Sequence, residues 1–527
     1  MRIFLLVSVI ASLTACKQST TDHKITFADN IVVAHRGAWK ANDLPENSIA
    51  ALKHAISIGC TGSEFDVRMT GDDILIVTHD ESYASLIVEE TTYEDLAKHK
   101  LDNGEILPTL EQYILAGMEH NKTTGLVCEI KPASTKERGE RMAQKAVELV
   151  AELQAERYIS SYISFDYNIL KKIVELNPNA HTQYLDGSKT PKELAKDGIS
   201  GLDYHINAFK NNPQWIKEAK DLGLSLNVWT VNEQLDIDLF VDHGFDYITT
   251  NEPELLYKRI EESPVNNGYE LVWSDEFNYQ GKPDTNKWSY EYGFIANEEQ
   301  QYYTDQSKNA RVQDGNLIIE AHKEKIKNEK YKSKEYEGKS HMKYAAEIDT
   351  AQYTSARLIT EGKASWKYGI VEVSAKLPTG RGIWPAIWML GDNRSEVGWP
   401  RCGEIDIMEY VGYDPDTIHG TIHSEAYNHM KNTEKTKNIF VENVYDEFHI
   451  YAVEWTPEKI DFSVNGEIYN SIQNEHKTDA EWPFDQEFSL ILNVAVGGSW
   501  GGQKGIDNSI LPNEMQVDYA RVFQIKK

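Results

Sequence analysis

The sequence Gly403-Glu404-Ile405-Asp406-Ile407-Met408-Glu409-Tyr410 alternates acidic and apolar side chains, as a β-strand with one buried face does. On a regular strand Glu404 and Asp406 point to one face, whereas Glu409, at an odd offset, points to the other. One extra residue in a β-bulge restores the register and brings all three acids to the same face. We therefore predict a bulged strand that presents three carboxylates on one side and its isoleucines to the core.

Residues 266–527, which contain this strand, show the same alternation of apolar and polar residues in several other places. Short alternating stretches recur between turn signals, for example at 316–321, 369–377, 448–455 and 488–496. This pattern predicts an all-β sandwich. The lysine-rich run 323–343 has no apolar period, and we expect a solvated loop there.

Carboxylates gathered on one strand face are the groups that a glycosidase needs. Two carboxyl groups flank the scissile bond, and a separation of about 5–5.5 Å gives retention through a covalent intermediate. Asp406, between Glu404 and Glu409, should hold a proton or hydrogen bond that moves their pKa values apart. Four tryptophans exceed the needs of a core and suit stacking on the apolar faces of sugars: Trp384, Trp388, Trp399 and Trp500.

The motifs in this half resemble glycoside hydrolase family 16, in particular its laminarinase-like branch. In addition to the acidic strand they are 271–277 (LVWSDEF), 297–300 (NEEQ), 383–389 (IWPAIWM), 419–423 (HGTIH), 492–498 (LNVAVGG) and 517–519 (VDY). The resemblance implies a β-jelly roll that hydrolyses β-1,3-glucan internally, with Glu404 as nucleophile, Glu409 as acid/base and Asp406 as their assistant. The sugar contacts that it implies are Asn297, Trp384, Trp388, Arg401, His423 and Trp500. It also implies a structural Ca²⁺, with Glu276, Gly315 and Asp518 as candidate ligands.

Residues 30–260 alternate between two patterns. Eight apolar or β-branched runs are candidate strands, and they lie at 31–35, 63–69, 126–130, 162–165, 181–185, 201–205, 225–230 and 247–249. Between them lie stretches with helical spacing, such as Ile49, Leu52 and Ile56 before Gly59. Eight strands separated by helices predict a (β/α)8 barrel, in which active-site residues lie at the C-terminal strand ends.

Charged residues lie at those strand ends. The first strand closes with His35 and Arg36, the second carries Glu64 and Asp66 on one face, and the third carries Glu129 and Lys131 on one face; His79 and Asp80 end a short run from Ile74. Three carboxylates at one barrel mouth repel one another unless a cation lies among them, and hard divalent ions prefer oxygen ligands. A metal with two histidines as base and acid suits hydrolysis of a phosphodiester.

These residues resemble the glycerophosphodiester phosphodiesterases. The matching motifs are 35–37 (HRG), 45–47 (PEN), 64–67 (EFDV), 79–80 (HD), 107–110 (LPTL) and 129–131 (EIK). The resemblance implies a TIM barrel with Ca²⁺ or Mg²⁺ on Glu64, Asp66 and Glu129. It also implies acid and base roles for His35 and His79, and phosphate contacts from Arg36 and Lys131. Residues 81–101 lack the Arg and Gly-rich turn of many members, and Asn251 replaces a more common Asp, which leaves the alcohol that the site recognises open.

Composition limits the classes of function. The chain has 527 residues, with 54 basic and 83 acidic side chains and a net charge of −29. Its length predicts more than one domain, and its acidity argues against nucleic acid as a partner. Four cysteines are too few for a disulfide scaffold, and we expect Cys60, Cys128 and Cys402 to be buried thiols.

The first 29 residues have the character of a targeting segment. After Arg2 the chain is uncharged from Ile3 to Cys16, which is too short to span a membrane and typical of a signal peptide. Residues 13–16 (LTAC) resemble a bacterial lipobox, which implies that Cys16 carries the lipid. We therefore expect a lipid-anchored protein of the bacterial cell envelope that contacts the membrane through its lipid only.

The predicted organisation is a signal peptide and tether (1–29), a (β/α)8 TIM barrel (30–260), a linker (261–265) and an all-β jelly-roll sandwich (266–527). The expected partners are β-glucan polysaccharide and a glycerophosphodiester, and both activities would meet on a β-glucan that carries phosphoglycerol groups. One alternative is hydrolysis of a galactan such as agar or carrageenan. Another is that one domain only binds carbohydrate beside a single active enzyme.

Overall fold

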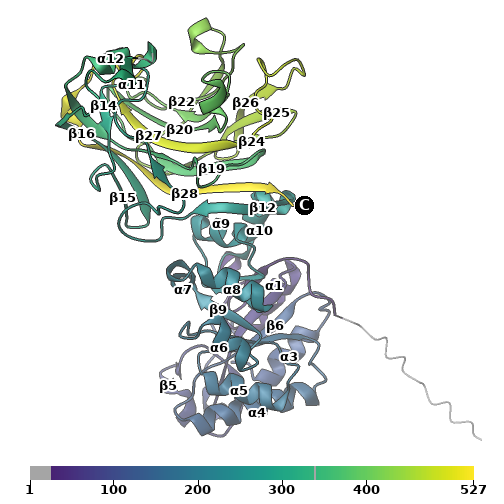
Figure 1. Cartoon of the computed structure of the whole chain (residues 1–527). Helices are drawn as coiled ribbons and strands as arrows, with labels where there is room; N and C mark the ends of the chain where they lie inside the picture. Colours follow the sequence, from purple (N-terminus) through teal and green to yellow (C-terminus); the bar gives the residue numbers. More distant parts are fainter. Residues whose placement is uncertain (1–24, 338–339, 527) are drawn as a thin grey trace, which may run out of the picture. The chain divides into compact units, whose positions relative to one another are not determined.

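The computed structural model describes residues 25–337 and 340–526. Cys16 and the predicted signal peptide lie outside the described residues. The chain divides into two compact units, with the main division between Tyr257 and Lys258, and each unit is described by itself (Figure 1). The predicted limits 30–260 and 266–527 stay predictions. Within the described residues no helix combines the length and apolar character that crossing a membrane requires.

The first unit is built around a closed parallel barrel. Its strands run in the order β1-β11-β10-β9-β8-β7-β6-β2, and β1 also pairs with β2, which closes the sheet. The bounds are β1 (Val32–Ala34), β2 (Gly62–Met69), β6 (Gly125–Ile130), β7 (Ile159–Ser164), β8 (Thr182–Tyr184), β9 (Gly201–His205), β10 (Ser225–Trp229) and β11 (Tyr247–Thr250). All eight predicted strands are therefore confirmed, and so is the barrel.

Three short strands supplement the barrel. β3 (Leu75–Val77) pairs antiparallel with β2, and β4 (Ser82–Tyr83) pairs with β5 (Leu86–Ile87) in a hairpin. The interior of the barrel is apolar where Val33, Val127, Ile163 and Leu185 pack together. This apolar layer supports the polar residues at the strand ends.

Helices alternate with the barrel strands along the chain. Their bounds are η1 (Lys40–Asn42), α1 (Ile49–Ser57), η2 (Val88–Glu90), α2 (Tyr93–Leu96), α3 (Leu110–Met118), α4 (Lys136–Glu152), α5 (Tyr167–Leu176), α6 (Pro191–Lys196), α7 (Ile206–Asn211), α8 (Gln214–Leu222), α9 (Gln234–Asp242) and α10 (Pro253–Glu262). α3 begins at Leu110, because its N-cap Thr109 forms a reciprocal capping box with Gln112.

The second unit is a sandwich of two antiparallel-rich sheets, as predicted. One sheet has the order β14-β17-β16-β28-β19-β24-β25-β26, with β12 on β28 and β15 on β16; the other has the order β13-β18-β27-β20-β21-β22-β23. Residues of both sheets, such as Val371 and Leu492, meet in one hydrophobic core. Alternating side chains fill this core, which is why short alternating stretches predict it.

The strands of the first of these sheets are β12 (Tyr269–Asp275), β14 (Gln301–Tyr303), β15 (Ala310–Gln313), β16 (Asn316–Lys327), β17 (Thr350–Ser355), β19 (Gly369–Lys376), β24 (His449–Trp455), β25 (Lys459–Val464), β26 (Glu467–Gln473) and β28 (Asn513–Ile525). Those of the second are β13 (Ser289–Tyr290), β18 (Arg357–Ile359), β20 (Ile383–Gly391), β21 (Glu404–Glu409), β22 (Thr417–His423), β23 (Lys435–Phe440) and β27 (Phe488–Val496). Short helices are η3 (Pro264–Asn267), α11 (Lys334–Glu337), η4 (Ser340–Met342), α12 (Lys343–Ala346), α13 (Arg394–Val397), η5 (His429–Lys431) and η6 (Asn508–Ile510).

The lysine-rich run 323–343 differs from the prediction. β16 continues through Lys327, and α11, η4 and α12 follow it. Tyr336, Met342, Ala345 and Ala346 are buried in a small core of their own. The expectation of a solvated loop was wrong, because single apolar residues on very short helices leave no period to detect.

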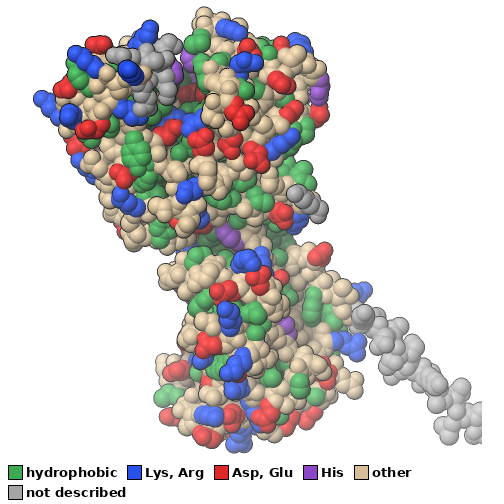
Figure 2. Space-filling view, viewed as in Figure 1, with side chains coloured by type: hydrophobic (Ala, Val, Ile, Leu, Met, Phe, Trp, Pro, Cys, Tyr) green, Lys and Arg blue, Asp and Glu red, His purple; other side chains and the backbone are tan. Residues whose placement is uncertain are grey.

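The surface charges are mixed, and the cysteines are buried. Acidic and basic side chains are interspersed on the visible face of each unit (Figure 2). Cys60, Cys128 and Cys402 are buried free thiols among the described residues, as predicted.

Candidate active sites

The bulged strand β21 presents its acids to one side, as predicted. β20 pairs Ile387 with Met408 but Trp388 with Asp406, so that Ile407 is the extra residue. The register to β22 shifts at the same place, between Asp406 and Glu409. Ile407 and Met408 are buried in the core, whereas the acids line a cavity. The predicted β-bulge is thus confirmed.

The cavity has a volume of about 780 Å³ and lies over the second sheet of the sandwich. Indole rings, two amides and two arginines line the cavity together with the three acids. The lining residues used below are Asn297, Glu299, His341, Arg357, Trp384, Trp388, Arg394, Trp399, His429, Met430 and Asn493. Apolar rings beside convergent polar groups are what a sugar-binding cleft requires.

Burial of the three acids together raises their pKa values. Burial, followed by the charge of Glu409, raises the pKa of Glu404 to about 8. Burial raises the pKa of Glu409 to about 7. Burial and the charges of both glutamates raise the pKa of Asp406 well above its usual range. Near neutral pH the group therefore retains protons, and one of them is available for donation.

Tryptophan side chains hold parts of this site through their indole N–H groups. Nε1 of Trp384 donates to Oε1 of Glu409 at 3.2 Å. Nε1 of Trp388 donates to Oδ1 of Asn493 at 2.8 Å, and Nδ2 of Asn493 donates to the Tyr303 hydroxyl at 3.1 Å. The Tyr303 hydroxyl in turn donates to Glu299 at 3.1 Å. These bonds orient the rings at the cavity wall.

Arg357, which the sequence analysis missed, supplies positive charge to the site. Its side chain is only 5% exposed, and Nε lies 2.6 Å from Oε2 of Glu291. The guanidinium carbon lies 4.6 Å from the centroid of the Trp388 ring. Its charge opposes the rise of the pKa of Glu404. The one signal in the sequence is a charged residue at the start of an apolar strand.

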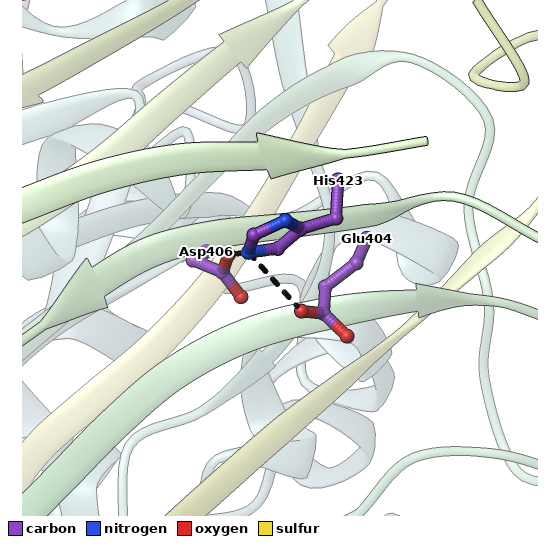
Figure 3. Close-up of side chains that lie close together, drawn as sticks. All are labelled: Glu404, Asp406 and His423. Atoms are coloured by element: carbon purple, nitrogen blue, oxygen red, sulfur yellow. Dashed lines mark ion pairs between the residues drawn. The ribbon is translucent and has the colours of Figure 1, made fainter. Parts of the chain in front are cut away.

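His423 on β22 lies beside the acids and outside the cavity lining (Figure 3). Its Nε2 is 3.4 Å from Oδ2 of Asp406 and 3.8 Å from Oε1 of Glu404. Burial, with the charge of His429, lowers the pKa of His423 to about 3. The imidazole is therefore neutral, and it contacts the acids as a dipole rather than as a cation.

The predicted sugar contacts divide into two groups. Asn297, Trp384 and Trp388 line the cavity. Arg401 and Trp500 do not: Arg401 pairs with Glu425 at 3.4 Å and is 63% exposed, and Trp500 packs edge-on against Trp384 at 5.5 Å. Trp500 thus supports a lining ring instead of lining the cavity.

In the barrel, three carboxylates meet at the ends of neighbouring strands. Asp66 on β2 is in register with Glu129 on β6, and Glu64 precedes Asp66 on the same face. One oxygen from each lies within 4.8 Å of the other two, and all three side chains are buried. Oε1 of Glu64 is buried without a hydrogen-bond partner among the described residues. This donor set fits a hard divalent cation, as predicted from the sequence.

The barrel acids differ in their electrostatic environment. Burial and the charge of Asp66 raise the pKa of Glu64 well above its usual range. The same two causes raise the pKa of Glu129 to about 7. Burial alone would raise the pKa of Asp66, but Lys131, Asn47 and neighbouring cations lower it. Nδ2 of Asn47 donates to Asp66 at 2.8 Å. The acids thus share less than full charge.

Two basic residues surround these acids. Arg36 donates its backbone N–H to Glu64 at 2.8 Å and pairs through its side chain with Glu46 at 2.5 Å. Nζ of Lys131 lies 2.8 Å from Glu129 and 3.2 Å from Asp66. Both predicted phosphate-binding residues therefore lie at the acidic cluster.

The two predicted catalytic histidines are both partly buried, and a neighbouring side chain holds one ring nitrogen of each. Nδ1 of His35 lies 2.8 Å from Oδ1 of Asn251, and burial, with the charge of Arg36, lowers the pKa of His35 to about 4. His79 is 38% exposed, and its Nδ1 lies 2.7 Å from Asp80. One nitrogen of each ring is thus held by a neighbour, which orients the other.

The predicted structural calcium site is not supported at Glu276. Both oxygens of Glu276 accept hydrogen bonds from Arg521, at 3.1 and 2.9 Å. Arg521 therefore occupies the carboxylate that we expected to bind Ca²⁺, and Gly315 and Asp518 stay untested candidates.

Known proteins resemble the two halves separately. A family model described as "Glycosyl hydrolases family 16" matches residues 297–521, and one described as "Glycerophosphoryl diester phosphodiesterase family" matches residues 35–255. A Beta-glucanase of Rhodothermus marinus is 49% identical over 266 residues, which are 49% of this chain and 85% of that protein. A Glycerophosphodiester phosphodiesterase of Caldanaerobacter subterraneus subsp. tengcongensis is 31% identical over 244 residues, which are 43% of this chain and 96% of that protein.

Among solved structures, the laminarinase from Rhodothermus marinus is 46% identical, with a TM-score of 0.44 over 49% of this chain and 98% of that one.

Proposed function

The chain belongs to glycosyl hydrolase family 16 in its second half and to the glycerophosphoryl diester phosphodiesterase family in its first, so both halves are hydrolases; on this premise we propose which bonds they cleave. The second half hydrolyses β-1,3-glucan internally, with retention. The first half hydrolyses glycerophosphodiesters in a metal-dependent reaction. The observation that carries the glucanase assignment is the bulged strand with Glu404, Asp406 and Glu409 on the wall of a tryptophan-lined cavity.

In the proposed glucanase reaction, Glu409 donates its proton to the glycosidic oxygen as Glu404 attacks the anomeric carbon. The bond to the leaving sugar breaks, and a covalent glycosyl ester forms on Glu404. Glu409, now ionised, takes a proton from a water molecule. The oxygen of this water attacks the anomeric carbon, and the bond between the sugar and Glu404 breaks. The indole of Trp384 holds the Glu409 carboxylate in place, and its N–H favours the ionised state.

The test is release of reducing ends from laminarin. We expect release by the wild-type protein and none by Glu404→Gln, which keeps the side-chain shape but removes the nucleophile. Release by Glu404→Gln would show that the acid assignment is wrong.

A panel with mixed-linkage glucan, agar and carrageenan separates the alternatives. Cleavage of a galactan alone would favour the galactanase alternative. Binding of a polysaccharide without cleavage would favour a binding module.

In the barrel, Glu64, Asp66 and Glu129 would hold a Ca²⁺ or Mg²⁺ ion. When bound, such an ion polarises a phosphoryl oxygen. Arg36 and Lys131 would neutralise the remaining charge of the phosphate. His35 and His79 would serve as base and acid, since one nitrogen of each ring is oriented by Asn251 or Asp80.

The test is hydrolysis of glycerophosphodiesters with different alcohols, with and without EDTA. We expect His35→Ala to abolish metal-dependent turnover. Unchanged turnover would contradict the assignment of His35.

We also propose that Cys16 is lipidated and anchors the protein in the bacterial cell envelope. The support is the uncharged run before Cys16 and its lipobox-like sequence. Globomycin should block processing of the expressed precursor, and Cys16→Ala should release the protein from the membrane fraction. Unaltered processing and fractionation would refute the anchor.

We also propose that the two activities act on one polymer. A β-glucan with phosphoglycerol groups would offer a bond to each half, and tethering raises the effective concentration of the second site. On such a glucan, full-length His35→Ala should release fewer sugar ends than the wild type, although both cut plain laminarin equally. Equal release on both substrates would count against coupling.

A further inference from the structure

The helical segment, residues 328–337 and 340–349, is closed on itself by hydrogen bonds of Asn328. Nδ2 of Asn328 donates to the carbonyls of Ala345 and Ile348 at 3.0 and 2.8 Å, and its backbone N–H donates to Asp349 O at 2.8 Å. Asn328 is only 1% exposed. Its amide therefore joins the two ends of the segment, so that α11 and α12 form a compact unit beside β14 and β16 (Figure 1).

Two tyrosines of the helical segment hold the cavity wall. The Tyr344 hydroxyl donates to Ala296 O at 3.0 Å, and the Tyr336 hydroxyl accepts from the backbone N–H of Phe294 at 3.2 Å. Phe294 is 1% exposed in the small core that these tyrosines build. The wall residues that follow, Ile295, Ala296 and Asn297, line the cavity, and Asn297 has a left-handed φ of 57°. Such a backbone persists only where its surroundings hold it.

The helical segment also reaches the cavity directly. His341, in η4, is exposed and lines it. The buried core behind η4 comes from Met342, Ala345 and Ala346, so the imidazole is carried by a packed support rather than by a free loop. An imidazole offers both a polar edge and a flat face to a sugar ring.

The helical segment is separated from the catalytic acids by other residues of the cavity wall. The backbone N–H of Ser499 donates to Asn297 O at 2.7 Å, and Gly498 packs between Asn297 and the ring of Trp384. The indole N–H of Trp384 in turn donates to Glu409. Asn297 and Trp384 therefore lie between the helical segment and Glu409, and we infer that a sugar that contacts His341 is not the sugar at the cleaved bond.

We propose that the helical segment forms an outer sugar subsite, with His341 as its contact and Tyr344 as the residue that positions its wall. The inference rests on the proposed glucanase function and adds a selection for chain length. Chains long enough to reach His341 gain binding energy there, whereas short ones do not. Because the contact is remote from the reacting atoms, it changes KM and leaves kcat nearly unaltered.

The experiment uses the full-length protein and a ladder of β-1,3-gluco-oligosaccharides from trimer to octamer. With His341→Ala we expect KM for the longest oligomers to rise about fivefold, the loss of roughly one polar contact, with kcat and the turnover of the trimer unchanged. Tyr344→Phe keeps the ring but loses the bond to Ala296, and should raise the same KM about threefold. Tyr331→Phe is the matched control. Tyr331 lies in the same helical segment, but it is 37% exposed and does not line the cavity.

The outcomes separate the two hypotheses. A wild-type protein that cuts none of the oligomers refutes the proposed glucanase and this inference with it. If the wild type is active, and if KM depends on oligomer length in the same way in His341→Ala and Tyr344→Phe as in the wild type, the outer subsite alone is overturned. Folding of each variant is checked by its melting temperature, and a loss of kcat on the trimer would also contradict a remote subsite.

Discussion

Nε1 of Trp384 donates a hydrogen bond to Oε1 of Glu409 at 3.2 Å, from the strand that pairs with β21. A donated N–H favours the ionised carboxylate, so this bond lowers the pKa of Glu409 against the effect of burial. In Trp384→Phe the ring stays but the donor is lost. We expect kcat/KM on laminarin to fall about tenfold, equal to about 1.4 kcal/mol. Because loss of the donor raises the pKa of Glu409, the pH optimum of the variant should move to higher pH.

The matched control for Trp384→Phe is Trp482→Phe. Trp482 is buried, and its Nε1 has no hydrogen-bond partner among the described residues. Its replacement can lower stability but should leave the pH optimum in place. An optimum that moves equally in both variants would contradict the role of the Trp384 bond.

Glu404→Gln should remove glucanase activity by at least about 10³-fold, because the amide cannot attack the anomeric carbon. It should also stabilise the fold at high pH. The pKa of Glu404 rises from 4.5 to about 8 on folding, so between these values the folded state keeps a proton that the unfolded chain has lost. Stability contributed by this site therefore falls as pH rises.

The measurement is thermal unfolding of wild type and Glu404→Gln at two pH values. We expect the variant to be more stable at pH 8 by about 1–3 kcal/mol and equal to the wild type near pH 4. A difference that is the same at both pH values would show that Glu404 does not titrate across this range.

The pH profile of laminarin hydrolysis should be bell-shaped with its maximum near pH 7 to 8. The reaction needs one proton shared between Glu404 and Glu409, whose pKa values are raised to about 8 and about 7. Below this window both acids are protonated and no nucleophile is ionised, and above it no acid remains. A maximum near the ordinary carboxylate pKa would contradict the burial of this pair.

Removal of metal should affect one activity only. Dialysis against EDTA should lower phosphodiester hydrolysis at least about 100-fold, because no ion on Glu64, Asp66 and Glu129 then polarises the phosphoryl oxygen, and Ca²⁺ or Mg²⁺ should restore it. Laminarin hydrolysis should stay unaltered. Binding of the ion should also raise the melting temperature of the barrel. At a 100-fold excess of ion over its Kd, the free energy of unfolding should rise by about 2.7 kcal/mol.

Glu64→Gln should remove this metal-dependent stabilisation, because it replaces a carboxylate ligand with an amide. Glu175→Gln is the control, since Glu175 is 69% exposed on α5. An equal loss in both variants would place the ion elsewhere.

Asn251→Asp should change the pH profile of the barrel. Oδ1 of Asn251 lies 2.8 Å from Nδ1 of His35, and the pKa of that histidine is lowered to about 4. A carboxylate at this position would stabilise the imidazolium and raise the pKa. The acid limb of phosphodiester hydrolysis should therefore move to higher pH. An unmoved limb would show that His35 is not the group that titrates.

The sequence predicted the strands better than the surfaces around them. Each barrel strand was visible as an apolar run, because strands buried on both faces are continuously hydrophobic. The core of the helical segment was not visible, because Tyr336, Met342 and Ala345 lie on helices of three or four residues. Arg401 matched a family pattern but pairs with Glu425 at the surface.

Local order along the chain was enough to place Glu404, Asp406 and Glu409 on one face and to call for a bulge, since side-chain direction in a strand alternates with period two. The same logic paired Glu64 with Asp66. Only the folded chain brings Arg357, Trp388 and Asn493 together, since they come from three strands that meet in the sheet. Contacts between residues so distant in sequence follow from strand order and packing, which no local pattern encodes.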